Sequence, residues 1–270
     1  MTDWLRIDRG AAPLLLSMPH SGIDLQDLEA RLVSGWLARK DTDWRIPELY
    51  GFAGSLGATV VRTTLSRTVI DVNRDPTGRS LYPGMASTEL CPTTTFDGEP
   101  LYVAGAAPTP AEVALRRQRW FDPYHAALRS ETERLLRDHD KVVVFDCHSI
   151  RSAVPRLFEG SLPQFNIGTN DGRACDAGLA EAIAALCAGS GFTHVLNGRF
   201  KGGYITRSVG DPGHRRHAVQ MELACRGYLP EPTHPAPDNW PPSFDAEYAK
   251  PLQDTLKQVL QTCLEFASAL

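Results

Sequence analysis

The chain has 270 residues, with 28 Lys and Arg against 32 Asp and Glu, a formal net charge of −4 and a hydrophobic fraction of 42%. This length fits one large α/β domain and is enough to bury a core without a disulfide or metal staple. The composition excludes a disordered chain and a membrane bundle. The slightly acidic balance argues against a nucleic-acid binder, which usually carries a basic face.

The N-terminus and the cysteines give no sign of export. No basic stretch followed by an apolar stretch opens the sequence, so no signal peptide is predicted. The longest apolar runs, such as Val142-Val143-Val144-Phe145, are too short to span a bilayer. None of the six cysteines forms a CxxC pair, which argues against a zinc knuckle. We therefore expect a cytoplasmic protein with free thiols packed as small hydrophobic side chains.

Hydrophobic periodicity predicts alternating strands and helices in the first part of the chain. The expected strands are 13–18, 58–63 and 68–72, and the expected helices are 25–38 and 44–56. Residues 75–109 are rich in Pro, Gly and Thr and predict a long irregular segment. Such a segment in a compact domain is usually a functional lid or wall.

The second part of the chain continues the same alternation. A long helix is expected from Pro110 to about Asp138, with Pro123 as a candidate kink. The apolar run KVVVFDC at 141–147 is typical of a strand that is buried on both faces. Further strands are expected at 165–168, 194–197 and 218–223, further helices at 176–188 and 252–267, and loops at 198–213 and 230–242. The pattern predicts a single α/β domain over residues 1–270, with a mixed, mostly parallel sheet and helices on both faces.

Polar residues stand at three predicted strand ends, where ligands bind in such sheets. His20 follows the first strand, His148 follows the 141–147 strand, and Glu222 lies near the end of a third. Two His and one carboxylate form the ligand set of many hydrolytic zinc sites, and a further Glu can act as the general base. Asp43 or Asp41 would be the third ligand. Taken singly, each His is more often an ordinary surface or core residue, and Asp43 is an N-cap.

Two further constellations suggest recognition of carboxylates. Arg67 and Arg74 flank a predicted strand, beside Asn73, and a guanidinium suits a carboxylate through paired hydrogen bonds. The alternative is structural ion pairing with Asp71 or Asp75. Further along, Gly202-Gly203 would permit close backbone approach to a ligand and Arg207 would add a cation, or the pair is only a hairpin turn. The order GxxxxGK[ST] of a phosphate loop is absent.

Several short segments, taken in order, resemble the N-formylglutamate amidohydrolases (N-formylglutamate deformylases) of histidine degradation. The resemblance covers about residues 13 to 260. The matching segments are SMPHSGID (17–24), DTDWRIPELY (41–50), SRTVIDVNRDP (66–76), PYH (123–125), FDCHSI (145–150), NIGTNDG (166–172), KGGYITRSVGDP (201–212) and QMELACRGYL (220–229).

The resemblance implies a phosphorylase/hydrolase-like fold similar to that of zinc carboxypeptidases. It also implies hydrolysis of N-formyl-L-glutamate to glutamate and formate, the last step of a histidine-degradation route. The carboxypeptidases use an HxxE motif, a later His and a distant Glu as base. Here Ile23 stands at the acidic position of that motif. Asp43, in a D-x5-L-Y segment like that of the family, is therefore placed as the third ligand with His20 and His148, while Asp24 and Asp41 remain alternatives and Glu222 matches the base.

The resemblance also assigns the substrate contacts. Asn73 and Arg74 match a pair that holds the substrate carboxylate, with Arg67 or Arg207 on the second carboxylate. Zinc is the expected cofactor, although cobalt, manganese and iron accept the same ligands. The expected partner is a small-molecule substrate, with no nucleic acid and no membrane, and the oligomeric state stays open. A deacylase of another N-acyl amino acid, of the succinylglutamate or acetylaspartate type, and a non-catalytic binder of acidic metabolites remain alternatives.

Overall fold

The computed structural model describes residues 4–80, 84 and 86–269. Its strands are β1 (Leu5–Asp8), β2 (Leu14–Met18), β3 (Thr59–Thr63), β4 (Val142–Ile150), β5 (Phe165–Gly168), β6 (His194–Leu196) and β7 (Arg216–Ala224). Its α-helices are α1 (Ile46–Leu49), α2 (Pro110–Arg116), α3 (Asp122–Leu136), α4 (Ala177–Gly189), α5 (Tyr204–Val209) and α6 (Ala246–Ser268).

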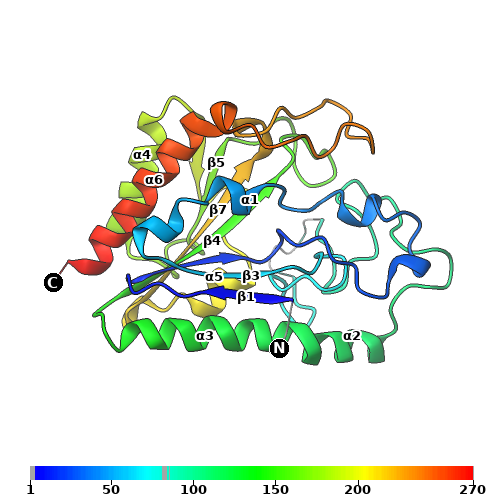
Figure 1. The fold of residues 1–270 in the computed structure, drawn as a ribbon, viewed down its shortest axis with the longest axis horizontal. Helices are drawn as coiled ribbons and strands as arrows, with labels where there is room; N and C mark the ends of the chain where they lie inside the picture. Colours follow the sequence, from blue (N-terminus) through cyan, green and yellow to red (C-terminus); the bar gives the residue numbers. More distant parts are fainter. Residues whose placement is uncertain (1–3, 81–83, 85, 270) are drawn as a thin grey trace.

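The seven strands form one sheet in the order β1-β3-β2-β4-β7-β5-β6 (Figure 1). The pairs β2–β3, β2–β4, β4–β7 and β5–β6 are parallel. The pairs β1–β3 and β5–β7 are antiparallel. The predicted mixed, mostly parallel sheet is confirmed. Helices lie on both of its faces, with α3 and α5 on one side and α1, α4 and α6 on the other (Figure 1).

The central strand β4 divides its side chains between two cores, as the alternation of a strand requires. Val143, Phe145 and Cys147 pack in the core that contains α4 and α6. Val142 and Val144 point to the opposite core, against α3. On that second face the strand continues with Asp146 and His148, so the face changes from apolar to polar toward the carboxyl end. Both polar side chains are nevertheless buried, at 0% and 2% exposure.

The neighbouring strand β7 changes in the same way. In the parallel register of β4 and β7, Asp146 pairs with Gln220 and His148 pairs with Glu222. Paired residues of adjacent strands point to the same face of the sheet. The register therefore collects an imidazole, two acids and an amide at one place near the strand ends. β4 extends to Ile150 because this pairing continues to its end, so His148 lies inside the strand and not after it as expected.

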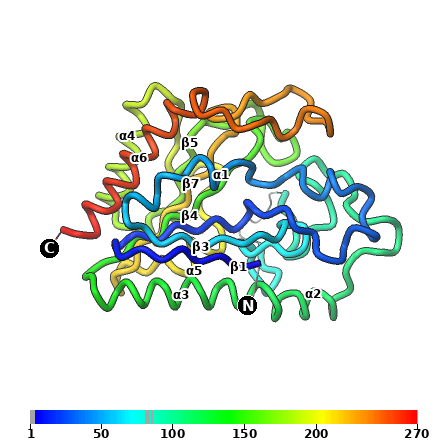
Figure 2. The backbone as a smooth tube through the Cα atoms, in the orientation of Figure 1, coloured from blue at the N-terminus to red at the C-terminus, as the bar shows by residue number. Residues whose placement is uncertain are grey.

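The predicted helix over 25–38 is wrong. Only the short 3-10 turns Glu29–Arg31 and Leu37–Arg39 form there. The backbone pairs instead with the later loop, through hydrogen bonds from Val33 N to Leu101 O (2.9 Å) and from Val103 N to Arg31 O (3.0 Å). These two distant segments lie side by side at the right of the tube in Figure 2. The apolar residues at helical spacing are buried, but they pack into the core from turns rather than from a continuous helix.

Two more local predictions are wrong in part or in full. The 44–56 helix is reduced to α1 and a 3-10 turn at Ala53–Leu56, and α1 starts after Arg45 rather than after an Asp cap. Residues 68–72 form turns rather than a strand, with bonds from Val69 N to Ser66 O and from Arg74 N to Asp71 O. The β-branched residues of this segment are buried in the core, and burial rather than strand pairing accounts for their composition.

Most other elements lie where they were expected. The long helix is continuous from α2 to α3 through the π-helical residues Arg117–Phe121, just before Pro123. The glycine-rich loop contains one unexpected element, the short helix α5. All six cysteines are free and buried, as predicted. The irregular 75–109 segment is confirmed where it is described, while residues 81–83 and 85 lie outside the described part. None of the described helices has the length and hydrophobicity that crossing a membrane requires.

Candidate active site

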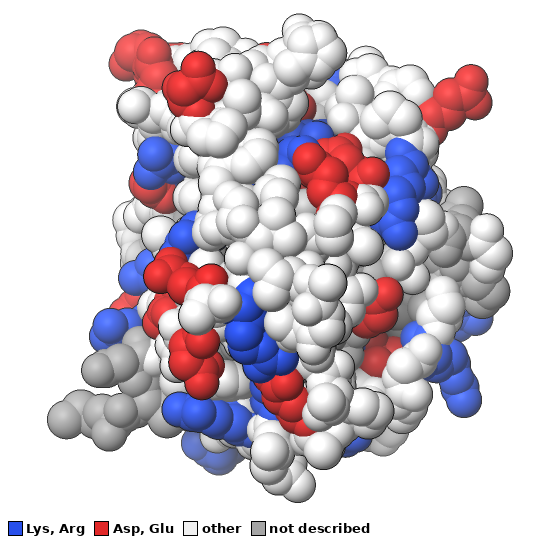
Figure 3. Space-filling view, turned by 90° about the vertical axis from the view of Figure 1, so that its right-hand side faces the viewer, with Lys and Arg blue, Asp and Glu red and all other residues white. Residues whose placement is uncertain are grey.

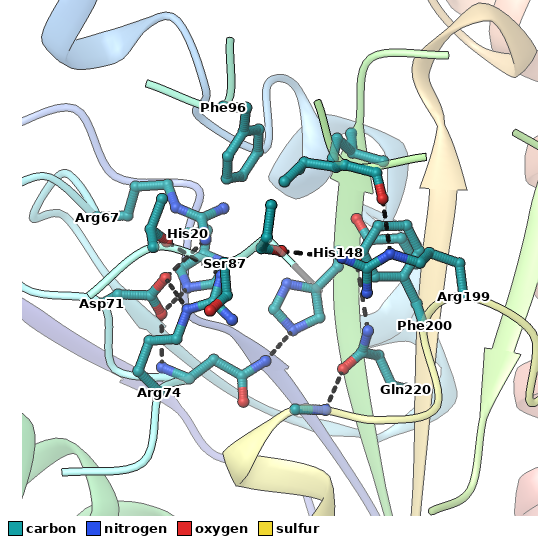
Figure 4. A pocket seen from close by; sticks show the side chains of 17 residues that line it. His20, Arg67, Asp71, Arg74, Ser87, Phe96, His148, Arg199, Phe200 and Gln220 are labelled. Atoms are coloured by element: carbon teal, nitrogen blue, oxygen red, sulfur yellow. Dashed lines mark hydrogen bonds and ion pairs between the residues drawn. The ribbon is translucent and has the colours of Figure 1, made fainter. Parts of the chain in front are cut away.

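A cavity opens at the carboxyl ends of β2, β4 and β7 (Figure 4). It is walled by histidines, acids and arginines from five segments of the chain. Predicted site residues on its wall are His20, Arg67, Asn73, Arg74, His148, Gly203 and Glu222; others are Asp71, Phe96, Arg199 and Gln220. The sheet supplies the floor, and the turns at 66–74 and the loop at 86–96 supply one side.

Beside the cavity, His20, Asp43 and His148 form a buried cluster whose ligand atoms all lie within 4.8 Å of one another. Nδ1 of His148 lies 3.0 Å from Oδ2 of Asp43, and Nδ1 of His20 lies 3.7 Å from the same oxygen. Within the described residues, His20 Nδ1 and Asp43 Oδ1 are buried without a hydrogen-bond partner. Two unsatisfied polar atoms in a His–Asp–His set suit a divalent cation, because burial without a partner is costly.

Each histidine is held from behind by a carboxylate. Nε2 of His20 lies 2.7 Å from Oδ1 of Asp71, and Nε2 of His148 lies 3.0 Å from Oδ2 of Asp146. Metal-ligating histidines usually donate their second ring N–H to such an acceptor, which fixes the tautomer and the ring orientation. Both rings thus present Nδ1 to Asp43. This arrangement fits a metal centre and was not deduced from the sequence.

The charges of the cluster depend strongly on one another. Burial opposes ionisation of Asp43, but hydrogen bonds with His148 and His20 hold the pKa of its carboxyl group well below the usual value. Burial likewise disfavours a charged His148, yet Asp146 and Asp43 raise the pKa of its imidazole well above the usual value. The carboxylates of Asp146 and Asp43 therefore favour the protonated form of the His148 ring.

Burial favours the protonated form of the Glu222 carboxyl group. Desolvation raises the pKa of its carboxyl group to about 8. Its Oε2 accepts a hydrogen bond from Nε2 of Gln220 (3.2 Å), whose Oε1 accepts one from the backbone N of Gly203 (2.7 Å). A buried carboxyl with a raised pKa next to a candidate metal centre is suited to general acid–base chemistry.

Two of the predicted arginines meet on one acid. Arg67 Nη2 lies 2.6 Å from Oδ2 of Asp71, and Arg74 Nε lies 3.3 Å from the same oxygen. The guanidinium of Arg67 also lies 4.6 Å from the ring centre of Phe96. Both arginines form ion pairs and also line the cavity, where a ligand can reach them. The two interpretations of the sequence are therefore compatible.

Asn73 is committed to the protein more than expected. Its Oδ1 accepts a hydrogen bond from Ile205 N (2.8 Å), and its Nδ2 lies 2.9 Å from Nε2 of His148. A Cβ atom on Gly203 would come within 2.4 Å of this amide. Glycine at position 203 therefore leaves room for a close contact with the backbone. The group in that contact is the Asn73 side chain and not a ligand.

The candidate residues differ in their surroundings. Of the three candidate aspartates, Asp43 joins the histidines, whereas Asp24 accepts hydrogen bonds from Gln26 and Asp41 accepts them from Phe96 N and Arg151. Gly202 and Arg207 are not among the described residues that line the cavity, and Arg207 Nε donates to the Gly202 carbonyl oxygen. The substrate contact expected of these two residues stays a prediction.

Arg199 lines the cavity where Arg207 was expected to. Its Nε donates to Leu157 O (2.9 Å) and its Nη2 to Ala86 O (3.1 Å). In Figure 4 it lies across His148 from Arg67 and Arg74. No spacing in the sequence distinguished it from Arg207. For Asp146 the sequence does contain a signal of a special role, because a carboxylate inside an otherwise apolar strand requires a partner.

The fold and this cluster define an α/β protein with a candidate metal centre and a buried acid at the carboxyl edge of its sheet. The model of one protein family, described as N-formylglutamate amidohydrolase, matches residues 12–229. The chain belongs to this family.

Individual relatives agree over nearly the whole length. The chain is 46% identical to an N-formylglutamate deformylase of Pseudomonas putida, covering 99% of this chain and 98% of the relative. It is 43% identical to an N-formylglutamate deformylase of Pseudomonas aeruginosa, covering 98% and 97%. A crystal structure of N-formylglutamate amidohydrolase from Ralstonia eutropha JMP134 superposes with a TM-score of 0.77 at 26% identity, covering 98% of both chains. A protein of Agrobacterium tumefaciens shares the fold, with a TM-score of 0.70 at 20% identity over 98% of this chain and 94% of that one.

Proposed function

We propose that this chain hydrolyses the formamide bond of N-formyl-L-glutamate in a metal-dependent reaction, releasing formate and L-glutamate. The observation that carries the proposal is the buried His20–Asp43–His148 cluster with Glu222 beside it, in a cavity lined by arginines. The curated relatives bear the name of this activity. The place of the reaction at the end of histidine degradation, and a likeness to zinc carboxypeptidases, are parts of the proposal supported by the family resemblance alone.

His20, Asp43 and His148 would hold the metal ion. A bound zinc ion supplies Lewis-acid polarisation of a carbonyl and lowers the pKa of water to near neutrality. The ligand atoms left without hydrogen bonds, Nδ1 of His20 and Oδ1 of Asp43, support this use of the cluster. The chemistry of two imidazoles and one carboxylate fits zinc and also cobalt, manganese or iron.

Glu222 would move the proton. As a carboxylate it removes a proton from the attacking water while the water oxygen bonds to the formyl carbon. It then delivers that proton to the glutamate nitrogen as the carbon–nitrogen bond breaks, which leaves formate and a free amine. Gln220, hydrogen-bonded to both Glu222 and Gly203 N, keeps the carboxyl group oriented. General-base assistance of this kind contributes about 10²–10⁴-fold to rate.

The arginines would recognise the two carboxylates of the substrate. Arg67 and Arg74 form one cationic wall, and Arg199 lies on the opposite side of His148 (Figure 4). Guanidinium groups suit carboxylates through paired, charge-assisted hydrogen bonds. Asn73 is engaged with the protein rather than with the substrate in this proposal, since its Oδ1 accepts a hydrogen bond from Ile205 N and its Nδ2 donates one to Oδ2 of Asp146.

Metal analysis combined with a formate-release assay tests the proposal. We expect the purified protein to hold about one divalent ion per chain, as single-metal hydrolases of this ligand type do. We expect kcat/KM to be highest for N-formyl-L-glutamate among its formyl, acetyl and succinyl analogues, and lower for N-formyl-L-glutamine, which lacks one carboxylate. Binding of N-formylglutamate without formate release would contradict the proposal, and a preference for acetyl or succinyl substrates would favour the other deacylases.

A further inference from the structure

Asp71 lies at the point where the candidate metal ligands meet the arginines. Its side chain is fully buried, at 0% exposure, in the turn-rich segment after β3. Figure 4 shows its carboxylate directed toward His20, Arg67 and Arg74. Its partners are two guanidinium groups and one imidazole nitrogen, all of them groups that a carboxylate can accept from.

The two oxygens of Asp71 divide their contacts. Oδ1 lies 2.7 Å from Nε2 of His20 and accepts a hydrogen bond from Asn73 N (2.9 Å). Oδ2 lies 2.6 Å from Nη2 of Arg67 and 3.3 Å from Nε of Arg74. One oxygen therefore serves the candidate metal ligand and the other serves the arginine wall.

Asp146 offers a natural comparison within the same site. Its Oδ2 lies 3.0 Å from Nε2 of His148, the other histidine of the cluster, and 3.3 Å from Nδ2 of Asn73. It is as deeply buried as Asp71, at 0% exposure. In the described part of the chain, the hydrogen bonds and ion pairs of Asp146 do not include an arginine. Both acids thus hold a histidine of the cluster, and Asp71 contacts two arginines as well.

We propose that Asp71 is a positioning residue that joins the two halves of the site, orienting His20 toward the metal position and the guanidinium groups of Arg67 and Arg74 toward a substrate carboxylate. The inference rests on the proposed function, since it takes the cluster as a metal centre and the arginines as carboxylate anchors. It goes beyond that function by making retention of the metal and recognition of the substrate depend on one side chain.

The chemistry of an amide shows why the role needs a carboxylate. An Asn at position 71 has one acceptor oxygen and one NH₂ group. Whichever way the amide turns, its NH₂ group faces either the Nε2–H of His20 or an arginine, and two donors then oppose each other. A buried donor left without an acceptor is unfavourable, and more so next to a charge. One substitution should therefore weaken both halves of the site.

The experiment compares Asp71→Asn with Asp146→Asn in two binding measurements. Zinc affinity of the metal-free protein is measured by competition with a chromophoric chelator. L-Glutamate affinity of the zinc-saturated protein is measured by calorimetry. We expect both variants to lose about 10- to 100-fold in zinc affinity, the usual effect of removing a partner of a ligating histidine. We expect only Asp71→Asn to lose glutamate affinity, by about tenfold or more, while Asp146→Asn stays within about twofold of the unaltered protein.

The outcomes separate this inference from the proposed function. If the unaltered protein binds no zinc or no glutamate, the proposed function fails. If it binds both, but Asp71→Asn loses zinc affinity alone, as Asp146→Asn does, Asp71 only supports His20 and the inference is overturned. Unchanged zinc affinity in Asp71→Asn overturns it as well.

A second variant tests the same link if Asp71→Asn does not fold. Arg74→Gln removes one of the cations that share Asp71, so the carboxylate should hold His20 more firmly and zinc affinity should rise about threefold or more. Arg199→Gln removes a cation from the opposite wall and controls for the change of cavity charge. An equal effect of the two arginine substitutions on zinc affinity, or no effect of either, contradicts the link through Asp71.

Discussion

For a single residue, Glu222, the place in the fold changes the acid–base behaviour of the side chain. On the sequence it is one Glu in a strand, but the register of β7 against β4 places it beside His148. It is only 8% exposed, and this burial raises the pKa of its carboxyl group to about 8. A proton acceptor with a pKa near the working pH can both take and return a proton during one turnover.

The substitution Glu222→Gln should separate proton transfer from metal binding. Gln has nearly the same volume and keeps hydrogen-bonding capacity, but it cannot accept the water proton. We expect turnover to fall by about 10²–10⁴-fold, while zinc content stays within about twofold of the unaltered protein. His148→Ala serves as the contrast and should lose the metal. Full turnover in Glu222→Gln would remove this residue from the proposed mechanism.

The raised pKa of Glu222 also predicts proton release when zinc binds. With a pKa of about 8, Glu222 is mostly protonated at pH 7 in the metal-free protein. A cation in the neighbouring cluster favours the carboxylate and expels the proton. Calorimetry in two buffers of different ionisation enthalpy should show about one more proton released by the unaltered protein than by Glu222→Gln at pH 7. The difference should vanish well above pH 8, and equal release at pH 7 would contradict it.

At the scale of elements, the site depends on segments that lack regular structure. Phe96, which covers Arg67, belongs to a loop held by charged contacts. Asp97 of this loop pairs with Lys40 Nζ (2.7 Å) and Arg151 Nη2 (2.7 Å), and Phe96 N donates to Asp41. These anchors belong to the chain just before Asp43 and just after β4. The loop is therefore tied to the same segments that carry the cluster.

Releasing this loop should weaken substrate binding more than chemistry. In Asp97→Asn both ion pairs are lost, and Phe96 no longer shields Arg67 from water. We expect KM for N-formylglutamate to rise about three- to tenfold, with kcat within about twofold, as loss of two partly exposed ion pairs allows. Asp254→Asn on α6 is the control. It likewise removes a carboxylate with two cationic partners, here two lysines, and should change neither constant. A fall in kcat with KM unchanged would contradict the role of the loop.

Across the whole molecule, the positive charge that matters for the proposed substrate lies at the cavity and is not reflected in the net charge. The net charge is −4, and the face in Figure 3 carries acidic and basic side chains in small mixed groups. Such a surface provides little long-range attraction for a dianionic substrate. The attraction in the proposed reaction comes instead from Arg67, Arg74 and Arg199 at the cavity. Their effect is strengthened by burial, since ionic interactions grow as water is excluded.

Metal removal should lower the stability of the whole fold. A ligand present at about 1,000 times its Kd stabilises the folded state by about 4 kcal/mol, which corresponds to a shift of about 8 °C in Tm for a chain of this size. Scanning calorimetry with and without a chelator should show this loss. The exposed His214→Gln variant should keep the shift and His148→Gln should lose it. An unchanged Tm on metal removal would contradict a buried metal centre.

The family, most strands and the residue types of the cluster can be predicted from the amino-acid sequence. Apolar runs identified β2 and β4, because a strand that is buried on both faces shows little polar alternation. Motif order carried the resemblance, which the family match confirmed. His20, Asp43 and His148 were all named, but the choice of Asp43 over Asp41 and Asp24 rested on the resemblance and not on any spacing.

How these residues meet follows from contacts between segments that are distant in the sequence. The helix expected at 25–38 is replaced by turns because the backbone there pairs with a loop some 70 residues later, which local periodicity cannot reveal. The register of β4 and β7 places Glu222 beside His148, Arg199 lies on the cavity wall, and the turns after β3 bring Asp71 to His20 and Arg67. Spacing along the chain fixes which residues can share a local element, while contacts between distant segments depend on packing of the whole core.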